Sequence, residues 1–336
     1  MKYLVCPGPG KSGTTLLHYL FTNNKDYAGP FQDKEYCYFR QDRDEKYKTI
    51  FNLDNLEKTP KSLFEFSPLY FSDVTLAKRK ATADRVKKTV RNPLILFTIR
   101  HPIRRSISSY IHCLQDFSRF GRNRHVIQQR RLNDPYTMTF GQALRTDQNI
   151  GMLLSETIKY YAELFGEDRV VFFFLEEDVK DIQRFYDFIS EKLNISAKGF
   201  LEANHVPRIL SQKNMPRYYY SEKNDINIVT DEGEVTLPKG IFYIANDVEH
   251  EVIANMDPLT ANTLMNAQKY WTNHFTPELQ QRLFDDFFKE DLSETLGNLD
   301  ASRSASPCPD YLSMPLSEKR VDYSKPDVGF LKSKLS

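Results

Sequence analysis

The feature that most constrains the fold is a glycine-rich loop between a predicted strand and a predicted helix near the start of the sequence. Residues 2–6 are a short apolar run of strand-forming residues, which indicates a buried parallel strand. The loop over residues 7–15 reads Pro-Gly-Pro-Gly-Lys-Ser-Gly-Thr-Thr, and residues 15–21 have helical character. In such a unit, backbone N–H groups converge on an anion where the helix begins. We therefore expect the loop to bind a phosphate.

The loop differs from the Walker A loop of ATP- and GTP-dependent enzymes, G-x-x-x-x-G-K-[ST]. Gly10, Lys11 and Ser12 match the end of that pattern, but Val5 stands where its first glycine belongs. Gly8 is too close to Lys11 to replace that glycine, and a further glycine and two threonines follow the lysine. The strict match fails. The plainer alternative is a glycine-rich turn with a solvated lysine.

Strands and helices alternate along the chain, which indicates a three-layer α/β/α fold with a central parallel sheet. Further buried strands are expected over three runs: residues 62–66, 93–99 and 169–175. Helices are expected over three others: residues 102–117, 148–165 and 179–193. The glycine loop then lies at the carboxyl edge of the sheet, where ligands bind in folds of this class.

The pattern changes after about residue 204. A β-hairpin insertion is expected at about residues 215–245, and a helix over residues 277–288 closes the fold. We expect one domain over residues 1–300. Over residues 301–336, Ser, Pro and Lys dominate and periodicity fades, so we expect a loosely held, flexible tail there.

Composition narrows the range of partners and sites. Lys and Arg number 46 against 45 Asp and Glu, which argues against nucleic acid as the main partner. The four cysteines form no C-x-x-C pair and the seven histidines show no metal-ligand spacing, so we expect neither a metal site nor a disulfide framework. Apolar runs are too short for a signal peptide or a membrane span, so we expect a cytoplasmic protein. The oligomeric state stays open.

A second motif follows the expected strand over residues 93–99. Arg100 lies at the strand end, Pro102 fits the first turn of a helix, and Ser108 lies two turns into that helix. An arginine and a hydroxyl are suitable donors for a second, separate phosphate. The alternative is a capped, solvated helix start, but the position at the end of a central strand favours binding.

Together the two motifs resemble those of the sulfotransferase family. Residues 11–17 look like its 5′-phosphosulfate loop, and residues 100–110 look like its 3′-phosphate motif, R-x-P-x-x-R-x-x-S-x-Y. The resemblance covers about residues 1–200 and implies the sulfotransferase fold, with a P-loop-like loop. It also implies metal-free transfer of a sulfuryl group from 3′-phosphoadenosine-5′-phosphosulfate (PAPS). It assigns PAPS binding to seven residues: Lys11, Ser12, Gly13, Thr14, Thr15, Arg100 and Ser108.

Two further segments resemble the carbohydrate-acting branch, which includes the heparan sulfate sulfotransferases. Residues 34–39 are similar to its K-E-x-H-F-F segment, and residues 65–71 to its E-K-[ST]-P-x-Y-F segment. By this resemblance Glu35 is the general base, Glu65 is the second candidate, and Lys11 meets the charge on the leaving oxygen. Structural ion pairs are the alternatives for both glutamates. A histidine base, as in small-molecule sulfotransferases, is a further alternative.

The sequence departs from that branch at two positions. Cys37 stands where the branch has histidine and Phe66 where it has lysine, so we expect an acceptor other than a standard heparan chain. The expected acceptor is a carbohydrate, either polysaccharide or glycolipid, and a small metabolite is the alternative. The basic run over residues 119–131 could contact the acceptor, or it could be an ordinary solvated surface. The tyrosines at 218–220 could stack on sugar rings, or they could pack within the protein. A nucleotide-dependent kinase and a non-catalytic nucleotide- or glycan-binding module remain open as other classes.

Overall fold

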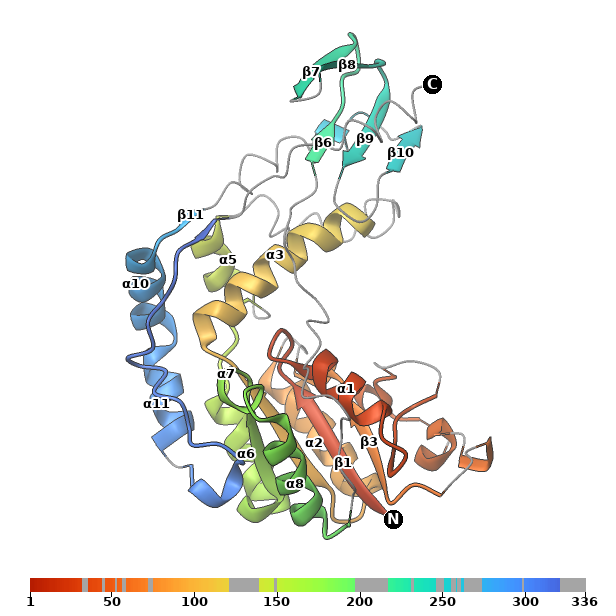
Figure 1. Ribbon diagram of the computed structural model, residues 1–336, viewed down its shortest axis with the longest axis vertical. Helices are drawn as coiled ribbons and strands as arrows, with labels where there is room; N and C mark the ends of the chain where they lie inside the picture. Colours follow the sequence, from red (N-terminus) through yellow and green to blue (C-terminus); the bar gives the residue numbers. More distant parts are fainter. Residues whose placement is uncertain are drawn as a thin grey trace. The chain divides into compact units, whose positions relative to one another are not determined.

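The computed structural model describes most of the chain, which forms two compact units (Figure 1). The described residues are 1–31, 36–43, 46–51, 53–55, 59–71, 75–120, 139–147, 150–196, 217–230, 233–245, 251–254, 258, 261–262, 274–297 and 299–320. The first unit contains Met1–Ser106, Met152–Leu210 and Phe284–Met314. The second contains Ile107–Gly151, Ser211–Leu283 and Pro315–Ser336.

The first unit is built on a five-stranded sheet in the order β2-β3-β1-β4-β5. All neighbouring strands are parallel. The strands are β1 (Lys2–Gly8), β2 (Tyr27–Ala28), β3 (Ser62–Phe66), β4 (Leu94–Ile99) and β5 (Val170–Phe174). Val5 of β1 pairs with Glu65 on one side and with Ile95 on the other. The loops that follow β1, β3, β4 and β5 therefore leave the sheet at the same edge.

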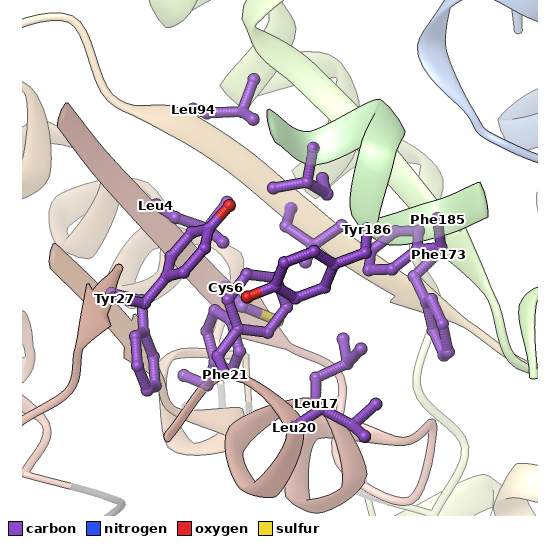
Figure 2. Close-up of a cluster of buried hydrophobic side chains, with 14 of the residues drawn as sticks. Leu4, Cys6, Leu17, Leu20, Phe21, Tyr27, Leu94, Phe173, Phe185 and Tyr186 are labelled. Atoms are coloured by element: carbon purple, nitrogen blue, oxygen red, sulfur yellow. The ribbon is translucent and has the colours of Figure 1, made fainter. Parts of the chain in front are cut away.

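Helices α1 (Thr14–Thr22) and α8 (Ile182–Leu193) cover one face of this sheet. Their apolar side chains meet those of alternate strand residues such as Leu4 and Cys6, which point to the same face (Figure 2). The ring of Phe21 lies 5.3 Å from that of Phe66 and 5.0 Å from that of Tyr186. Burying a side chain of this size contributes about 1.5–3 kcal/mol. The cluster thus holds the start of α1 at the end of β1.

Helices α2 (Leu76–Thr89) and α6 (Ser155–Phe165) cover the opposite face. Tyr161 of α6 meets Phe97 of β4 edge to face, with ring centroids 5.2 Å apart. Ala83 and Val86 of α2 are fully buried. Helix α11 (Lys289–Gly297) contacts α6 through Asp291, which accepts a hydrogen bond from the backbone N–H of Ser155. The predicted α/β fold with a central parallel sheet is confirmed.

The helix expected over residues 148–165 begins at Ser155 and residues 150–154 are not helical, so the predicted start of this helix was wrong. The carboxylate of Asp291 accepts the backbone N–H groups of Leu154 and Ser155 at 2.9 and 3.0 Å and caps the helix there. A short helix that was not predicted, α5 (Phe140–Thr146), begins with a capping box between Thr139 and Gln142.

The chain from residue 301 packs against the sheet up to Tyr311, where the sequence led us to expect a loose tail. The short helix η7 (Ala301–Arg303) follows α11, and the Nε of Arg303 donates to the carbonyl of Val170 at 2.9 Å. Ser304 forms an isolated parallel bridge with Phe172 of β5. Tyr311 is almost fully buried. Residues 321–336 of the expected tail lie outside the described residues.

The second unit contains the predicted hairpin. Strands β7 (Ile226–Thr230) and β8 (Gly233–Leu237) pair antiparallel, as expected. The last part of the segment expected to form the hairpin is instead a strand of a separate sheet. This strand, β9 (Ile241–Ala245), pairs with β6 (Arg217–Tyr219) and β10 (Glu251–Ala254). Two elements continue from one unit into the other: α3 (Pro102–Phe120) and α10 (Pro277–Phe287).

Short elements complete the described chain. They are η1 (Tyr38–Arg40), η2 (Tyr47–Phe51), η3 (Leu53–Asn55), η4 (Pro68–Tyr70), η6 (Glu167–Arg169), α7 (Leu175–Asp178), β11 (His274–Phe275) and β12 (Lys319–Arg320). Strands β11 and β12 pair antiparallel. Within the described ranges, no helix has the length and apolar character that crossing a membrane requires.

Candidate nucleotide-binding site

The loop between β1 and α1 depends on glycine for its conformation. Gly13 has a φ of 104°, in the left-handed region that side chains rarely adopt. A Cβ atom there would lie 3.0 Å from Cδ1 of Leu175 and 3.3 Å from Cε1 of Phe173. Lys11 is also left-handed, with a φ of 63°. Glycine at position 13 lets the backbone turn directly into the first turn of α1.

The start of α1 carries backbone N–H groups that the helix itself does not pair. Gly13 is the N-cap residue and provides no side-chain cap, so the first N–H groups of α1 have no partner within the helix. The adjacent Ser12 is fully buried, and its Oγ has no hydrogen-bond partner in the described part of the chain. A buried hydroxyl without a partner is unfavourable, which points to a ligand that would supply one. A phosphate oxygen fits both the helix N-terminus and the hydroxyl.

Neighbouring strands support the loop from two sides. The Oγ1 of Thr98, near the end of β4, donates to the carbonyl of Pro9 at 3.3 Å. On the β3 side, a Cβ atom added to Gly8 would lie 3.0 Å from Cα of Pro68. Thr14 is buried and Thr15 is half-buried at the start of α1. The loop is therefore enclosed by the ends of β3 and β4.

Arg100 joins the second motif to this loop. Its Nη1 donates to the carbonyl of Lys11 at 2.9 Å, and its Nε lies 4.0 Å from Oε1 of Glu176. Burial lowers the pKa of Arg100 from its ordinary value, and the nearby Glu176 opposes that shift. The structure thus brings Lys11 and Arg100 together. Ser108 lies half-buried on α3 in the second unit.

His101, the neighbour of Arg100, is almost fully buried. Its ring lies against Phe284 at 5.0 Å and Tyr311 at 5.8 Å. Burial, with a smaller effect of Arg104, lowers the pKa of His101 to about 4. This imidazole is neutral at pH 7 and only weakly basic, which does not favour it as the general base.

Glu65, the second candidate for the base, is enclosed by aromatic residues. Its Oε1 accepts the backbone N–H of Tyr38 at 3.0 Å and the hydroxyl of Tyr70. Burial raises the pKa of Glu65 to about 6, and these hydrogen bonds oppose the shift. The side chain is fully buried, so Glu65 is placed to hold the segment at Tyr38 rather than to touch an acceptor. Glu35 lies outside the described residues.

The two departures from the carbohydrate-acting branch have clear structural roles. Phe66 is fully buried and belongs to the core under α1, where its ring packs on those of Phe21 and Phe64. Cys37 is buried, and its Sγ lies 3.0 Å from Oγ of Ser67, within hydrogen-bond distance for sulfur. Most of the basic run over residues 119–131 lies outside the described residues.

Two residues of this site were missed by the sequence analysis. Glu176 lies on α7, two residues after β5 ends, and accepts the backbone N–H of His101 at 3.1 Å through Oε1. Its Oε2 accepts the hydroxyl of Tyr311 at 3.0 Å. The position of Glu176 directly after a buried strand was a usable signal, whereas Tyr311 lies in a segment without periodicity. In the ranges that the structure describes, no three His, Cys, Asp or Glu side chains gather to hold a metal ion.

Comparison with known proteins gives matches to solved structures. No family model and no curated protein matches the chain. A sulfotransferase from Alicyclobacillus acidocaldarius is 19% identical, with 58% of this chain and 80% of that chain covered and a TM-score of 0.42. The sulfotransferase domain of the Synechococcus PCC 7002 olefin synthase is 16% identical, with coverage of 59% and 74% and a TM-score of 0.35. A mouse sulfotransferase complexed with PAP is 18% identical, with coverage of 90% and 87% and a TM-score of 0.39. Matches at such low identity and TM-score do not indicate the activity of this chain. Any proposal of its function therefore rests on its own residues.

Proposed function

We propose that this chain is a sulfotransferase that moves a sulfuryl group from PAPS to a hydroxyl or amine of an acceptor. One observation carries the proposal: Arg100 donates to the carbonyl of Lys11, beside a loop whose buried Ser12 hydroxyl has no hydrogen-bond partner among the described residues. A glycine loop at a helix N-terminus and an arginine are two separate anion-binding elements. PAPS carries phosphate groups at both its 5′ and 3′ positions, so it matches such a pair.

The residues of the loop suit the leaving side of the reaction. The acceptor atom forms a bond to sulfur while the bond from sulfur to the bridging oxygen breaks, and that electron pair stays on the 5′-phosphate. Lys11 stabilises the bridging oxygen, and Thr14 and Thr15 with the N–H groups of α1 hold the 5′-phosphate. Arg100 holds the 3′-phosphate, a role that the motif also assigns to Ser108.

The acceptor side rests on the resemblance to the carbohydrate-acting branch. We propose Glu35 as the base that takes the acceptor proton, with Glu65 ordering the neighbouring segment through Tyr38 and Tyr70. The proposed acceptor is a carbohydrate, and a small metabolite is the alternative. We further propose that the transfer needs no metal, so a chelator should leave turnover unchanged.

Calorimetry distinguishes this function from a kinase. Adenosine 3′,5′-bisphosphate should bind more tightly than ATP, by about tenfold or more. Arg100→Ala should remove that preference, and Arg91→Ala, at an exposed arginine after α2, serves as the matched control. Incubation with labelled PAPS and a panel of glycans, glycolipids and phenols then identifies the acceptor. Tighter binding of ATP with transfer of its phosphate would establish a kinase, and nucleotide binding without any transfer would establish a binding module.

A further inference from the structure

We propose that Glu176 is a positioning residue for Arg100 and that the C-terminal segment over residues 301–311 holds it in place through Tyr311. The inference rests on the proposed function, since it concerns how the 3′-phosphate is recognised. It assigns a role in the site to a carboxylate that neither phosphate motif contains, and to a segment far from both in the sequence.

The contacts of Glu176 place it at the centre of a small network. Oε1 accepts the backbone N–H of His101 at 3.1 Å and lies 4.0 Å from Nε of Arg100. Oε2 accepts the hydroxyl of Tyr311 at 3.0 Å. The Glu176 side chain is only 14% exposed. With both oxygens engaged in this way, the carboxylate is held in one orientation beside the guanidinium.

The segment that carries Tyr311 is anchored at several points. Arg303 donates to the carbonyl of Val170 at 2.9 Å. The hydroxyl of Ser306 donates to the buried carboxylate of Asp178 and accepts from Nη2 of Arg184 at 2.6 Å. Because these partners lie on β5, α7 and α8, the segment is attached to the rigid part of the first unit, and Tyr311 is a fixed support for Glu176.

The same network orients Arg100. Nη1 is occupied by the carbonyl of Lys11 and Nε faces Glu176, whereas Nη2 has no hydrogen bond within the ranges that the structure describes. The Arg100 side chain is 25% exposed. Two fixed contacts thus leave the remaining donors of the guanidinium available to a phosphate. Without Glu176, only the hydrogen bond to Lys11 restrains the side chain, and binding loses preorganisation.

A substitution at Glu176 should therefore weaken recognition of the 3′-phosphate selectively. We expect Glu176→Ala to lower the affinity for adenosine 3′,5′-bisphosphate about tenfold, equivalent to about 1.4 kcal/mol. The affinity for adenosine 5′-monophosphate, which lacks that phosphate, should change less than about twofold. The KM for PAPS should rise with kcat nearly unchanged, since the 3′-phosphate is remote from the bond that breaks. Glu177→Ala is the matched control, because Glu177 pairs with Lys180 at the surface.

Three further variants and one control separate positioning from general stability. In an Arg100→Ala background, Glu176→Ala should cause no additional loss of affinity. Tyr311→Phe should lower the affinity for the bisphosphate about threefold, while Tyr160→Phe, which removes a surface hydroxyl bonded to Asp84, should not. Glu176→Gln should restore part of the lost affinity, since its oxygen still accepts a hydrogen bond.

The outcomes separate this inference from the proposed function. Equal losses for both nucleotides in Glu176→Ala, or an unchanged or higher affinity for the bisphosphate, would overturn the role of Glu176. A wild-type protein that does not prefer the bisphosphate over the monophosphate would instead overturn the proposed function. If Glu176→Ala fails to fold, the same comparison between nucleotides in Tyr311→Phe and Glu176→Gln decides.

Discussion

The guanidinium of Arg100 donates a hydrogen bond from Nη1 to the backbone carbonyl of Lys11, at 2.9 Å. The two residues follow β1 and β4, which are neighbours in the sheet, so their strand ends meet at one edge. The contact uses the backbone of Lys11 as acceptor and does not involve its amine. Recognition by Arg100 and the geometry of the glycine loop are thereby linked.

We expect Lys11→Ala to act mainly on the chemical step. A single donor that stabilises charge at the leaving oxygen is worth about 10²–10³ in kcat. Steady-state kinetics with PAPS should show that loss, with a smaller change in KM, and Lys78→Ala on the exposed side of α2 should match wild type. A rise in KM at constant kcat would mean that Lys11 only binds the ground state.

Ser12→Ala should change stability and binding in opposite directions. The free protein loses a buried hydroxyl without a described partner, so its unfolding free energy should stay the same or rise by about 1 kcal/mol. Affinity for adenosine 3′,5′-bisphosphate should fall about fivefold, because a phosphate contact is lost. Urea unfolding and calorimetry measure the two effects. Ser190→Ala is the control: its hydroxyl is bonded to that of Tyr27, so this variant should be less stable. A Ser12→Ala protein that is equally destabilised would contradict the prediction.

Gly13→Ala should destabilise the loop. A φ of 104° is unfavourable for alanine by about 1–3 kcal/mol, and the added Cβ would press on Leu175. Both effects should lower the urea midpoint and weaken nucleotide binding. Gly141→Ala in α5 is the matched control, since its Cβ would meet no heavy atom within 4 Å and alanine favours a helix. Equal stability of the two variants would show that the loop adapts to a side chain.

The contribution of Glu65 to the unfolding free energy should fall as pH rises from about 4.5 to about 6, whereas that of His101, whose pKa is lowered from 6.5 to about 4, should rise over this range. The pKa of Glu65 is raised from 4.5 to about 6 in the folded protein, so the folded state binds this proton more tightly than the unfolded state. Stability from the bound proton is complete below pH 4.5 and is lost as pH passes 6, by about 2 kcal/mol. Asp178, whose pKa is also raised to about 6, contributes with the same sign.

Glu65→Gln tests this dependence. The amide oxygen still accepts from Tyr38 and Tyr70, but it does not titrate, so the slope of the unfolding free energy against pH between 4.5 and 6 should become more positive. Urea unfolding at several pH values measures the slope. Glu163→Gln, at an exposed position on α6, should keep the wild-type slope. An unchanged slope in Glu65→Gln would show that Glu65 ionises normally in the folded state.

Features with a local cause were predictable from the sequence. Strand β3 has the predicted bounds, residues 62–66, and the unit β1–loop–α1 lies where the glycines indicated it. Apolar periodicity and glycine positions act over a few residues, so a linear reading captures them. The capping box that begins α5 at Thr139 was equally local and was overlooked.

Features with a distant partner were not predictable. The start of α6 is set by Asp291, which is 136 residues away from Ser155. The segment around Arg303 is held to the sheet by a hydrogen bond to the carbonyl of Val170. No pattern among neighbouring residues in the sequence reveals this contact. For the same reason the sequence analysis did not single out Glu176. The hydrogen bonds that hold Arg100 and Glu176 in the candidate site come from residues far apart in the sequence. The glycine loop, by contrast, is formed by neighbouring residues.

The hydrogen bond between Glu176 and Tyr311 has a consequence for how the protein is made. It joins residues that are 135 positions apart, so Tyr311 is synthesised well after Glu176. At about 5–20 residues per second, roughly 7–27 s separate the synthesis of the two residues. During that interval the nascent chain already contains the glycine loop and Arg100, but not the support that orients the arginine. The proposed support of Arg100 is therefore completed only after residue 311 has been synthesised, so chains that stop before this residue lack it.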